Sequence, residues 1–279
     1  MKLIRHTLLA LVITASLPAQ EALKSALVFH ASFDTALDAD FSTGSKACRI
    51  KKGKETVPAT FNEEVNLDVV GGKFGGCLHF PKKGVTRPQF SGVNVLGYND
   101  KSWSTTVSAW LRLSPDEDLE PGYCDPVQIV GDDGKKGFIF LEWSKDEKPR
   151  FFRYAIRPLA HIWNPTNVQW SDIPFEKRPM VQVSKAPFHR EVWTQVVFTI
   201  ENVNAKEPKP RGSLFINGKL QGRIENWDLT FAWDPAQVAL VLGASYVGRI
   251  DDLAVFSRAL TDEEVGILHE LPRGIASLR

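Results

Sequence analysis

The sequence lacks an excess of charge of either sign, and this absence narrows the range of partners. Its 279 residues include 34 lysines and arginines and 33 aspartates and glutamates, which gives a formal net charge of +1. No basic stripe or acidic block runs along the chain. Because binding to nucleic acid depends on clustered basic residues, we expect no nucleic-acid partner.

Long apolar runs and common catalytic motifs are also missing. A membrane-spanning helix needs roughly 20 apolar residues, and no segment of the chain is that long and apolar, so no membrane span is expected. The sequence has no HExxH motif, no GxSxG nucleophile elbow and no phosphate-binding loop. Its three cysteines contain no CxxC pair, so a zinc site is not expected either.

The first 20 residues show the order of segments found in secretory signal peptides. Lys2 and Arg5 precede an apolar run over residues 8–15, and small residues follow up to Ala19. The pattern predicts a signal peptide over residues 1–19 and a mature protein that is secreted or otherwise extracytoplasmic, in the periplasm or at the cell surface. The alternative is an N-terminus that is merely apolar.

Strand signals dominate the rest of the chain. Short runs are separated by clusters of Gly, Pro, Asn and Asp, which is typical of an all-β sandwich. Between Trp103 and Leu113 the odd positions are mostly apolar and the even ones mostly polar, as in a strand with one buried face. Asn217 and Gly218 predict a two-residue hairpin turn between two further strands.

One helix is predicted, near the C-terminal end. Thr261 and Glu264 have the spacing of a capping box, in which each side chain satisfies a free backbone donor of the first turn. Pro272 and Gly274 limit this helix to about three turns. Its apolar stripe consists of Val265, Leu268 and Leu271.

Four segments together resemble a known family. They are residues 72–80 (GKFGGCLHF), 107–111 (VSAWL), 214–219 (LFINGK) and 248–265, in which the strand GRIDDLAVF runs into the capped helix. This combination is similar to the laminin G-like jelly rolls of the concanavalin A-like lectin/glucanase superfamily. The resemblance implies an all-β, two-sheet antiparallel jelly-roll sandwich with one short C-terminal helix, built as a single domain over residues 20–279.

One segment, from about residue 145 to 190, has no counterpart in that family pattern. It is too rich in proline for long strands and too rich in aromatic residues for a disordered linker. We call it the aromatic insertion and interpret it as an elaboration of the domain. Trp110 and Trp193, outside it, match strand positions of the family and are interpreted as packing residues.

The aromatic insertion contains five candidate carbohydrate-binding residues: His161, Trp163, Asn164, Trp170 and Asp172. Sugars stack their apolar faces on aromatic rings and need polar groups beside those rings. The two tryptophans would stack on sugar rings, and the three polar residues would orient hydroxyl groups. The alternative is that the aromatic residues form the insertion's own small core.

Asp34 and Asp251 are the candidate metal ligands. Asp251 shares strand parity with Leu253 and Val255, so its carboxylate needs a cation or several hydrogen-bond donors. Related jelly rolls often hold a structural calcium between an aspartate at this place on the last strand and groups near the first strand. The resemblance therefore implies calcium between Asp251 and Asp34. The alternative is that both carboxylates accept only backbone donors.

Export would permit disulfides, although three cysteines leave at least one unpaired. Cys48 and Cys77 lie in predicted strands, whereas Cys124 lies in a segment typical of loops. We predict a disulfide between Cys48 and Cys77 and a free Cys124. Other pairings, or three reduced thiols, are the alternatives.

The resemblance also bears on activity. Glycosidases of this wider fold group place paired carboxylates along one strand as Glu-x-Asp-x-x-Glu, and no such motif occurs here. The nearest acidic cluster, residues 142–147, is expected to be solvated. We therefore predict a noncatalytic recognition module for a polysaccharide or other glycan. A protein-binding or adhesion module and a divergent polysaccharide-active enzyme are the two alternatives.

Overall fold

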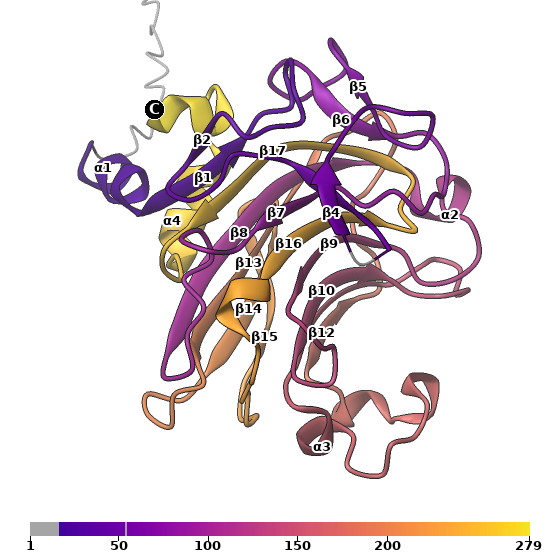
Figure 1. Cartoon of the computed structure of the whole chain (residues 1–279), viewed down its shortest axis with the longest axis vertical. Coiled ribbons are helices and arrows are strands. Elements are labelled where there is room, and N and C mark those ends of the chain that lie inside the picture. Colours follow the sequence, from indigo (N-terminus) through magenta and orange to yellow (C-terminus); the bar gives the residue numbers. More distant parts are fainter. Residues whose placement is uncertain (1–16, 54) are drawn as a thin grey trace, which may run out of the picture.

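The protein is a two-sheet antiparallel sandwich, as the sequence predicts (Figure 1). The structure is a computed structural model that describes residues 17–53 and 55–279. Residues 1–16 of the predicted signal peptide lie outside the described residues. No helix within these ranges is long and apolar enough to cross a membrane.

One sheet has nine strands among the described residues. Seven of them follow the order β15 (Lys219–Ile224), β14 (Arg211–Ile216), β13 (Thr194–Val203), β8 (Trp103–Arg112), β17 (Gly248–Phe256), β1 (Leu27–Ala31) and β2 (Phe41–Ser42). The other two are β6 (Cys77–Phe80), which pairs with β17, and β5 (Asn66–Asp68), which pairs with β6. The predicted hairpin is the turn between β14 and β15, where Asn217 and Gly218 have φ angles of 49° and 73°.

The second sheet has eight strands in the same part of the chain. Their order is β12 (Met180–Val183), β11 (Phe152–Arg157), β10 (Phe138–Trp143), β9 (Asp125–Val130), β16 (Ala239–Ala244), β7 (Gln89–Ser91), β3 (Arg49–Lys52) and β4 (Glu55–Pro58). A short helix, α2 (Pro115–Asp118), follows β8, and a 3-10 turn, η3 (Pro235–Gln237), precedes β16.

Alternating side chains of the central strand β8 help to build the core between the sheets. Trp103, Val107 and Leu111 are each at most 1% exposed and belong to the same apolar cluster as Ile129 and Leu141 of the eight-stranded sheet. Burial of one such side chain contributes about 1.5 to 3 kcal/mol. The alternation predicted for residues 103–113 is therefore confirmed.

Helical segments cover the outer face of the nine-stranded sheet near the chain ends. These are α1 (Leu17–Ala26), α4 (Asp262–His269) and the 3-10 segment η4 (Gly274–Leu278). Leu23 of α1 and Val265 of α4 pack with Phe215 and Phe256 of the sheet in a second apolar cluster. Figure 1 shows α1, α4 and the C-terminus on the same side of the molecule.

The capping box of α4 is present as predicted. The Thr261 hydroxyl accepts a hydrogen bond from the backbone N–H of Glu264, and the Glu264 carboxylate accepts one from the N–H of Thr261. Helix α1 was not predicted, and the predicted cleavage site after Ala19 falls in its first turn. The α1 residues that pack on the sheet, Leu23 and Ala26, lie beyond that site.

The aromatic insertion is continuous with the eight-stranded sheet. It contributes β11 and β12 to one edge of that sheet, and between them it forms α3 (Ala160–Trp163), η1 (Trp170–Asp172) and η2 (Phe175–Lys177). Figure 1 shows α3 and the turns around it extending past the ends of β10 and β12.

The three cysteines are free and buried in the structure, so the predicted bridge between Cys48 and Cys77 is not present. Cys48 directly precedes β3 of the eight-stranded sheet, whereas Cys77 begins β6 of the nine-stranded sheet. Burial raises the pKa of both thiols to about 12 and that of Cys124 to about 11. Such thiols carry little thiolate, the form that exchanges with disulfides, and they act here as small apolar residues.

Candidate functional site

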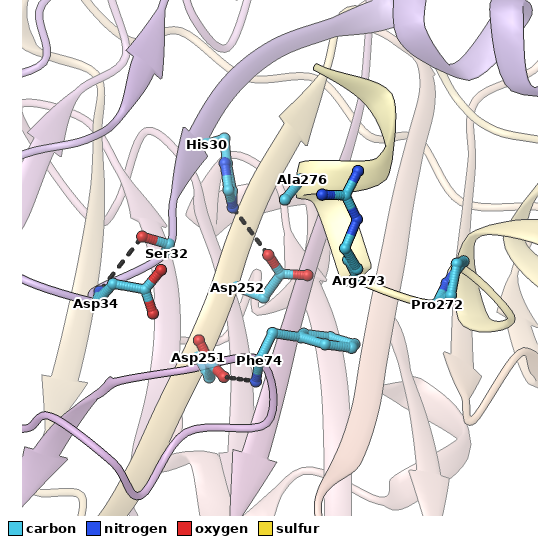
Figure 2. Close-up of a pocket in the computed structure, with 9 residues that line it drawn as sticks. All are labelled: His30, Ser32, Asp34, Phe74, Asp251, Asp252, Pro272, Arg273 and Ala276. Atoms are coloured by element: carbon cyan, nitrogen blue, oxygen red, sulfur yellow. Dashed lines mark hydrogen bonds and ion pairs between the residues drawn. The ribbon is translucent and has the colours of Figure 1, made fainter.

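The first candidate region is a cavity of about 350 Å³ at one end of the sandwich, which we call the end cavity. Figure 2 shows its walls: β1 and the residues after it, the loop 72–76, β17, and the C-terminal segment 272–276. The residues lining it are His30, Ser32, Asp34, Phe74, Asp251, Asp252, Pro272, Arg273 and Ala276.

The two predicted metal ligands meet in the end cavity, and both hold the loop 72–76. The Asp251 carboxylate accepts hydrogen bonds from the backbone N–H groups of Lys73 (2.5 Å) and Phe74 (3.1 Å). The Asp34 carboxylate accepts one from the N–H of Gly76 (2.7 Å). A Cβ at Gly75 would lie 2.2 Å from the Asp34 carboxylate, so the loop needs glycine there.

Asp252 holds the other wall of the end cavity. One of its carboxylate oxygens is 2.8 Å from Nε2 of His30, and the other accepts a hydrogen bond from the backbone N–H of Ile275 (3.0 Å). Asp252 has a φ of 50°, and the pairing of β17 with β8 shifts register between Asp251 and Ala254. This irregularity places two successive carboxylates in one cavity, where Figure 2 shows both.

The electrostatics of Asp251 reflect this burial. Asp251 is only 1% exposed. This burial is the larger cause, and the negative charge of Asp252 the smaller, of the rise in its pKa to about 7. The hydrogen bonds from Phe74 and Lys73 act in the opposite direction. Asp251 is therefore far easier to protonate than an ordinary aspartate.

The end cavity fits calcium only in part. Calcium takes six to eight oxygen ligands, and Asp34 and Asp251 supply two carboxylates. Residues 17–53 and 55–279 contain no group of three or more His, Cys, Asp or Glu side chains arranged to hold a metal. Backbone carbonyls and water would have to supply the other ligands. The contacts that both aspartates make are hydrogen bonds from backbone N–H groups of the loop 72–76, as expected if the carboxylates accept only backbone donors.

The second candidate region is the aromatic insertion, where the two predicted tryptophans pack against each other. The rings of Trp163 and Trp170 are 5.4 Å apart, edge to face. The Arg157 guanidinium lies 3.8 Å from the centre of the Trp170 ring and 5.0 Å from that of Trp163, and Arg178 lies 4.7 Å from Trp170. Both indoles are half-buried, so neither is a free surface ring.

This cluster sits on a small apolar patch of the eight-stranded sheet. Phe140 and Met180 are buried there, and Trp170 packs against them. The Arg157 guanidinium also lies 4.6 Å from the centre of the Phe140 ring. The insertion therefore has its own small core, and the tryptophans take part in it.

The polar candidates of the insertion differ in availability. His161 and Asp172 are exposed. Asn164 instead closes a turn: its amide nitrogen donates to the Val168 carbonyl (2.8 Å), and its amide oxygen accepts from the Val168 N–H (3.1 Å). Asn164 is thus committed to the fold of the loop.

Several buried polar atoms around the insertion have no hydrogen-bond partner in the protein. They include the indole N–H groups of Trp163 and Trp170, Nε of Arg157 and one carboxylate oxygen of Asp125. The other Asp125 oxygen accepts a hydrogen bond from the Gln128 amide (2.6 Å). Burial, followed by the charge of Glu142, raises the pKa of Asp125 to about 7. Asp125 was not predicted as a site residue, since it has no motif around it.

Glu142 corrects one expectation. It was expected to be solvated, but it is 3% exposed and lies 3.1 Å from Arg153, which is 5% exposed. The antiparallel pairing of β10 with β11 places these two residues directly opposite each other. Burial raises the pKa of Glu142, while the Arg153 guanidinium favours its ionised form.

Comparison with protein families gives one match. The model of a family described as the concanavalin A-like lectin/glucanases superfamily matches residues 90–266. No curated protein sequence matches the chain.

Solved structures with similar folds are binding domains. The ligand-binding domain of botulinum neurotoxin serotype D, in complex with N-acetylneuraminic acid, has a TM-score of 0.58 and 15% identity, covering 90% of this chain and 52% of its own. Domain 4 of AbnA, an extracellular GH43 arabinanase from Geobacillus stearothermophilus, was solved in complex with arabinotriose. It has a TM-score of 0.54 and 18% identity, covering 88% of this chain and 98% of its own.

A third structure is a complex with a protein. The binding domain of botulinum neurotoxin DC, bound to rat synaptotagmin II, has a TM-score of 0.58 and 15% identity, covering 92% of this chain and 52% of its own. The chain thus spans about half the length of the neurotoxin domains. At these identities the likeness concerns the fold alone.

Proposed function

The chain belongs to the concanavalin A-like lectin/glucanase superfamily, and from this premise we propose that it is a secreted, noncatalytic protein that binds carbohydrate through its aromatic insertion. The structures reported above with bound N-acetylneuraminic acid and arabinotriose support a glycan as the ligand class. Fold alone does not fix function, so the proposal rests on the chemistry of the insertion.

One observation carries the proposal: buried N–H groups without partners surround a half-buried pair of indole rings. The orphaned donors belong to Trp163, Trp170 and Arg157. Buried donors are nearly always satisfied in folded proteins, by protein groups, ordered water or a ligand, and for this cluster we propose a ligand. These N–H groups have almost no accessible surface, so sugar hydroxyls would accept them only after the insertion shifts to expose them. The partly exposed ring faces would contact the sugar C–H groups.

The remaining polar residues would add selectivity at the edge of this site. His161 and Asp172 are exposed in the same insertion and would orient hydroxyl groups of an extended chain. Asn164 would contribute only by shaping the turn, because both ends of its amide are occupied.

Tryptophan substitution tests the proposal. A glycan array first identifies a ligand, and titration calorimetry then compares wild type with Trp163→Ala and Trp170→Ala. Each variant should lose about 1 to 3 kcal/mol of binding free energy, the cost of truncating an aromatic anchor. Phe61→Ala is the matched control, since Phe61 is an aromatic residue outside the insertion that is 46% exposed. Wild-type affinity in both tryptophan variants would refute the proposal.

A protein ligand is the second candidate, and two exposed apolar residues of the insertion favour it. Val168 and Phe175 are 43% and 46% exposed, which suits the core of a protein interface. The complex of the neurotoxin DC domain with synaptotagmin II supports a protein ligand for this fold. Blank glycan arrays, together with saturable binding of one purified surface protein that Phe175→Ser abolishes, would favour this candidate.

An enzyme is the third candidate, because two buried carboxylates lie near the insertion. Burial raises the pKa of both Asp125 and Glu142, as required of a general acid. However, Glu142 is engaged by Arg153, which speaks for a structural role. Release of reducing ends from a bound polysaccharide, lost in Asp125→Asn, would establish catalysis.

We also propose that calcium, if bound, would sit between Asp34 and Asp251 in the end cavity. A ligand that binds only the folded state raises stability by mass action, about 2.7 kcal/mol at 100 times its Kd. The melting temperature of protein stripped with chelator should therefore rise on addition of calcium and should not rise in Asp34→Asn. Magnesium is the control ion. An unchanged melting temperature in the stripped wild type would exclude the site.

A further inference from the structure

A second cavity, of about 450 Å³, lies beside the end cavity. Phe74 and Pro272 line both cavities. Besides these two residues its walls contain Lys73, Trp110, Trp193, Asn217, His269, Glu270 and Leu271, and we call it the tryptophan cavity. It lies against the outer face of the nine-stranded sheet, because Trp110 of β8 alternates with the core residues Ala109 and Leu111.

The back wall of the tryptophan cavity is rigid and aromatic. Trp110 is 4% exposed, in agreement with its predicted packing role. Its ring stacks on His269 at 5.4 Å and meets the edge of Phe74 at 5.7 Å. The Lys73 ammonium lies 4.8 Å from the centre of the Trp110 ring. Asp251 fixes the position of Lys73 and Phe74 through their backbone N–H groups, so this wall is formed before any ligand arrives.

Trp193 differs from its predicted packing role. It is half-buried, and the Arg112 guanidinium lies 4.9 Å from the centre of its ring. Its indole N–H is buried and has no hydrogen-bond partner in the protein. The Trp193 ring lines the cavity and offers a stacking surface to a ligand, whereas its N–H has almost no accessible surface.

The other polar groups around the tryptophan cavity supply hydrogen-bond donors and acceptors, some neutral and some charged. The Asn217 amide oxygen accepts from the Gln195 N–H (2.9 Å), which leaves the amide N–H₂ group for other contacts. Nδ1 of His269 lies 3.1 Å from the Gln195 side-chain oxygen, so Nδ1 donates and Nε2 is left as an acceptor. Lys73 and Glu270 are exposed and have opposite charges.

We propose that the tryptophan cavity is a second binding site, which takes one neutral pyranose unit, independently of whether the aromatic insertion binds glycan. The apolar face of the sugar would lie against Trp193, and its hydroxyls would pair with Asn217 and Glu270. A cavity of this volume is of the size that holds a small molecule. Because Glu270 balances Lys73, the site gives no preference to an acidic sugar.

Nuclear magnetic resonance tests this site separately from the insertion. Protein labelled with ¹⁵N at its indoles is titrated with the methyl glycosides of glucose, galactose and mannose, and the Trp193 signal is assigned from Trp193→Phe. At least one glycoside should shift the Trp193 indole resonance in a saturable way, whether or not the resonances of Trp163 and Trp170 also move. Shifts confined to Trp163 and Trp170, or none at Trp193 with any of the three, would overturn the proposal.

A charge-neutral substitution at the rim gives the second test. Glu270→Gln removes an ionic acceptor from an exposed position, so the fold is unaffected and affinity for the glycoside should fall at least tenfold, as roughly expected for a hydrogen bond to a charged group. Glu263→Gln, exposed in the first turn of α4 and outside the cavity, is the matched control. Equal affinity in Glu270→Gln and Glu263→Gln would remove Glu270 from the site and refute the assignment.

Discussion

The end cavity and the aromatic insertion both gather charged and polar side chains, but they satisfy them differently. In the end cavity the carboxylates of Asp34, Asp251 and Asp252 each accept backbone N–H groups. In the insertion, Arg157 and two indoles leave buried N–H groups without partners. The hydrogen bonds of the end cavity maintain the fold, whereas the open donors of the insertion are the basis on which we propose a ligand there.

The loop 72–76 and the aromatic insertion also differ in the kind of contact that holds them. In the glycine-rich loop 72–76, the backbone N–H groups of residues 73, 74 and 76 are held by carboxylates from β17 and from the residues after β1. The insertion is held by the strand pairing of β11 and β12 and by backbone hydrogen bonds such as that from Ala160 N–H to the Lys135 carbonyl. Ring–guanidinium contacts, at 3.8 to 5.0 Å for Arg157 over the two indoles, add to these. Each ring–guanidinium contact is worth about 0.5 to 2 kcal/mol and requires the cation to lie over the face of the ring. The loop 72–76 therefore depends on carboxylates, whereas the turns of the insertion depend also on contacts between aromatic rings and cations.

We expect Asp252→Ala to have the largest effect, which is a loss of folding stability. This change leaves His30 and the N–H of Ile275 without their partner and should lower the free energy of unfolding by about 3 to 5 kcal/mol, as for breaking a buried pair. Urea denaturation measures it. Asp172→Ala, exposed in the insertion, should change stability by less than about 0.5 kcal/mol. Similar losses in both variants would break the distinction between the two regions.

The pH dependence of stability should sharpen the comparison. Burial raises the pKa of Asp125 and of Asp251 from 3.8 to about 7. Between these values the folded protein binds more protons than the unfolded chain, so the free energy of unfolding falls as pH rises from about 4 to 7. We expect a decrease on the order of 1 to 3 kcal/mol between pH 5 and pH 8.

Two matched variants assign this decrease to one region or the other. Asp125→Asn should remove the part of the decrease in the free energy of unfolding that Asp125 contributes. Asp251→Asn should remove the part that the end cavity contributes, and its new amide oxygen can still accept hydrogen bonds from the loop 72–76. Asp172→Asn is the exposed control. Denaturation series at four pH values measure the slopes, and a stability that rises from pH 5 to pH 8 in wild type would contradict the predicted sign.

The smallest effect concerns the helix that leads the chain to the end cavity. Thr261→Ala removes the hydroxyl that accepts the Glu264 N–H and should cost about 1 kcal/mol. Thr261→Ser keeps the hydroxyl and should cost far less. Thermal melting compares the two. If Thr261→Ala reduced the binding free energy for a glycoside by more than it reduced the free energy of unfolding, α4 would take part in ligand binding as well as in the fold.

Features determined by neighbours in sequence could be predicted well. The capping box of Thr261, the hairpin at Asn217 and the alternation of β8 depend on spacings of one to four residues, and all three are present. Helix α1 could not be predicted, because its stability comes from packing of Leu23 and Ala26 on α4 and η4 and not from a periodic pattern of its own.

The candidate sites were predicted less completely, since their chemistry depends on contacts distant in sequence. Asp34 and Asp251 were placed together by resemblance to the family, whereas their partners in the loop 72–76 were not predicted. The burial of Glu142 depends on its strand partner Arg153, and the raised pKa of Asp125 depends on its own burial and on Glu142, which lies on the neighbouring strand β10. Composition cannot tell a satisfied side chain from an unsatisfied one.

The pairing of β1 with β17 has a consequence for the order of folding. Leu27 pairs with Phe256, so the strand nearest the start of the sandwich has its partner more than 200 residues later. Contacts of such sequence separation slow folding, because a long loop must close before they form. A chain that emerges N-terminus first therefore holds β1 unpaired on the β17 side until almost the whole sequence is available. The sandwich therefore cannot close until the last strand of the chain has been made.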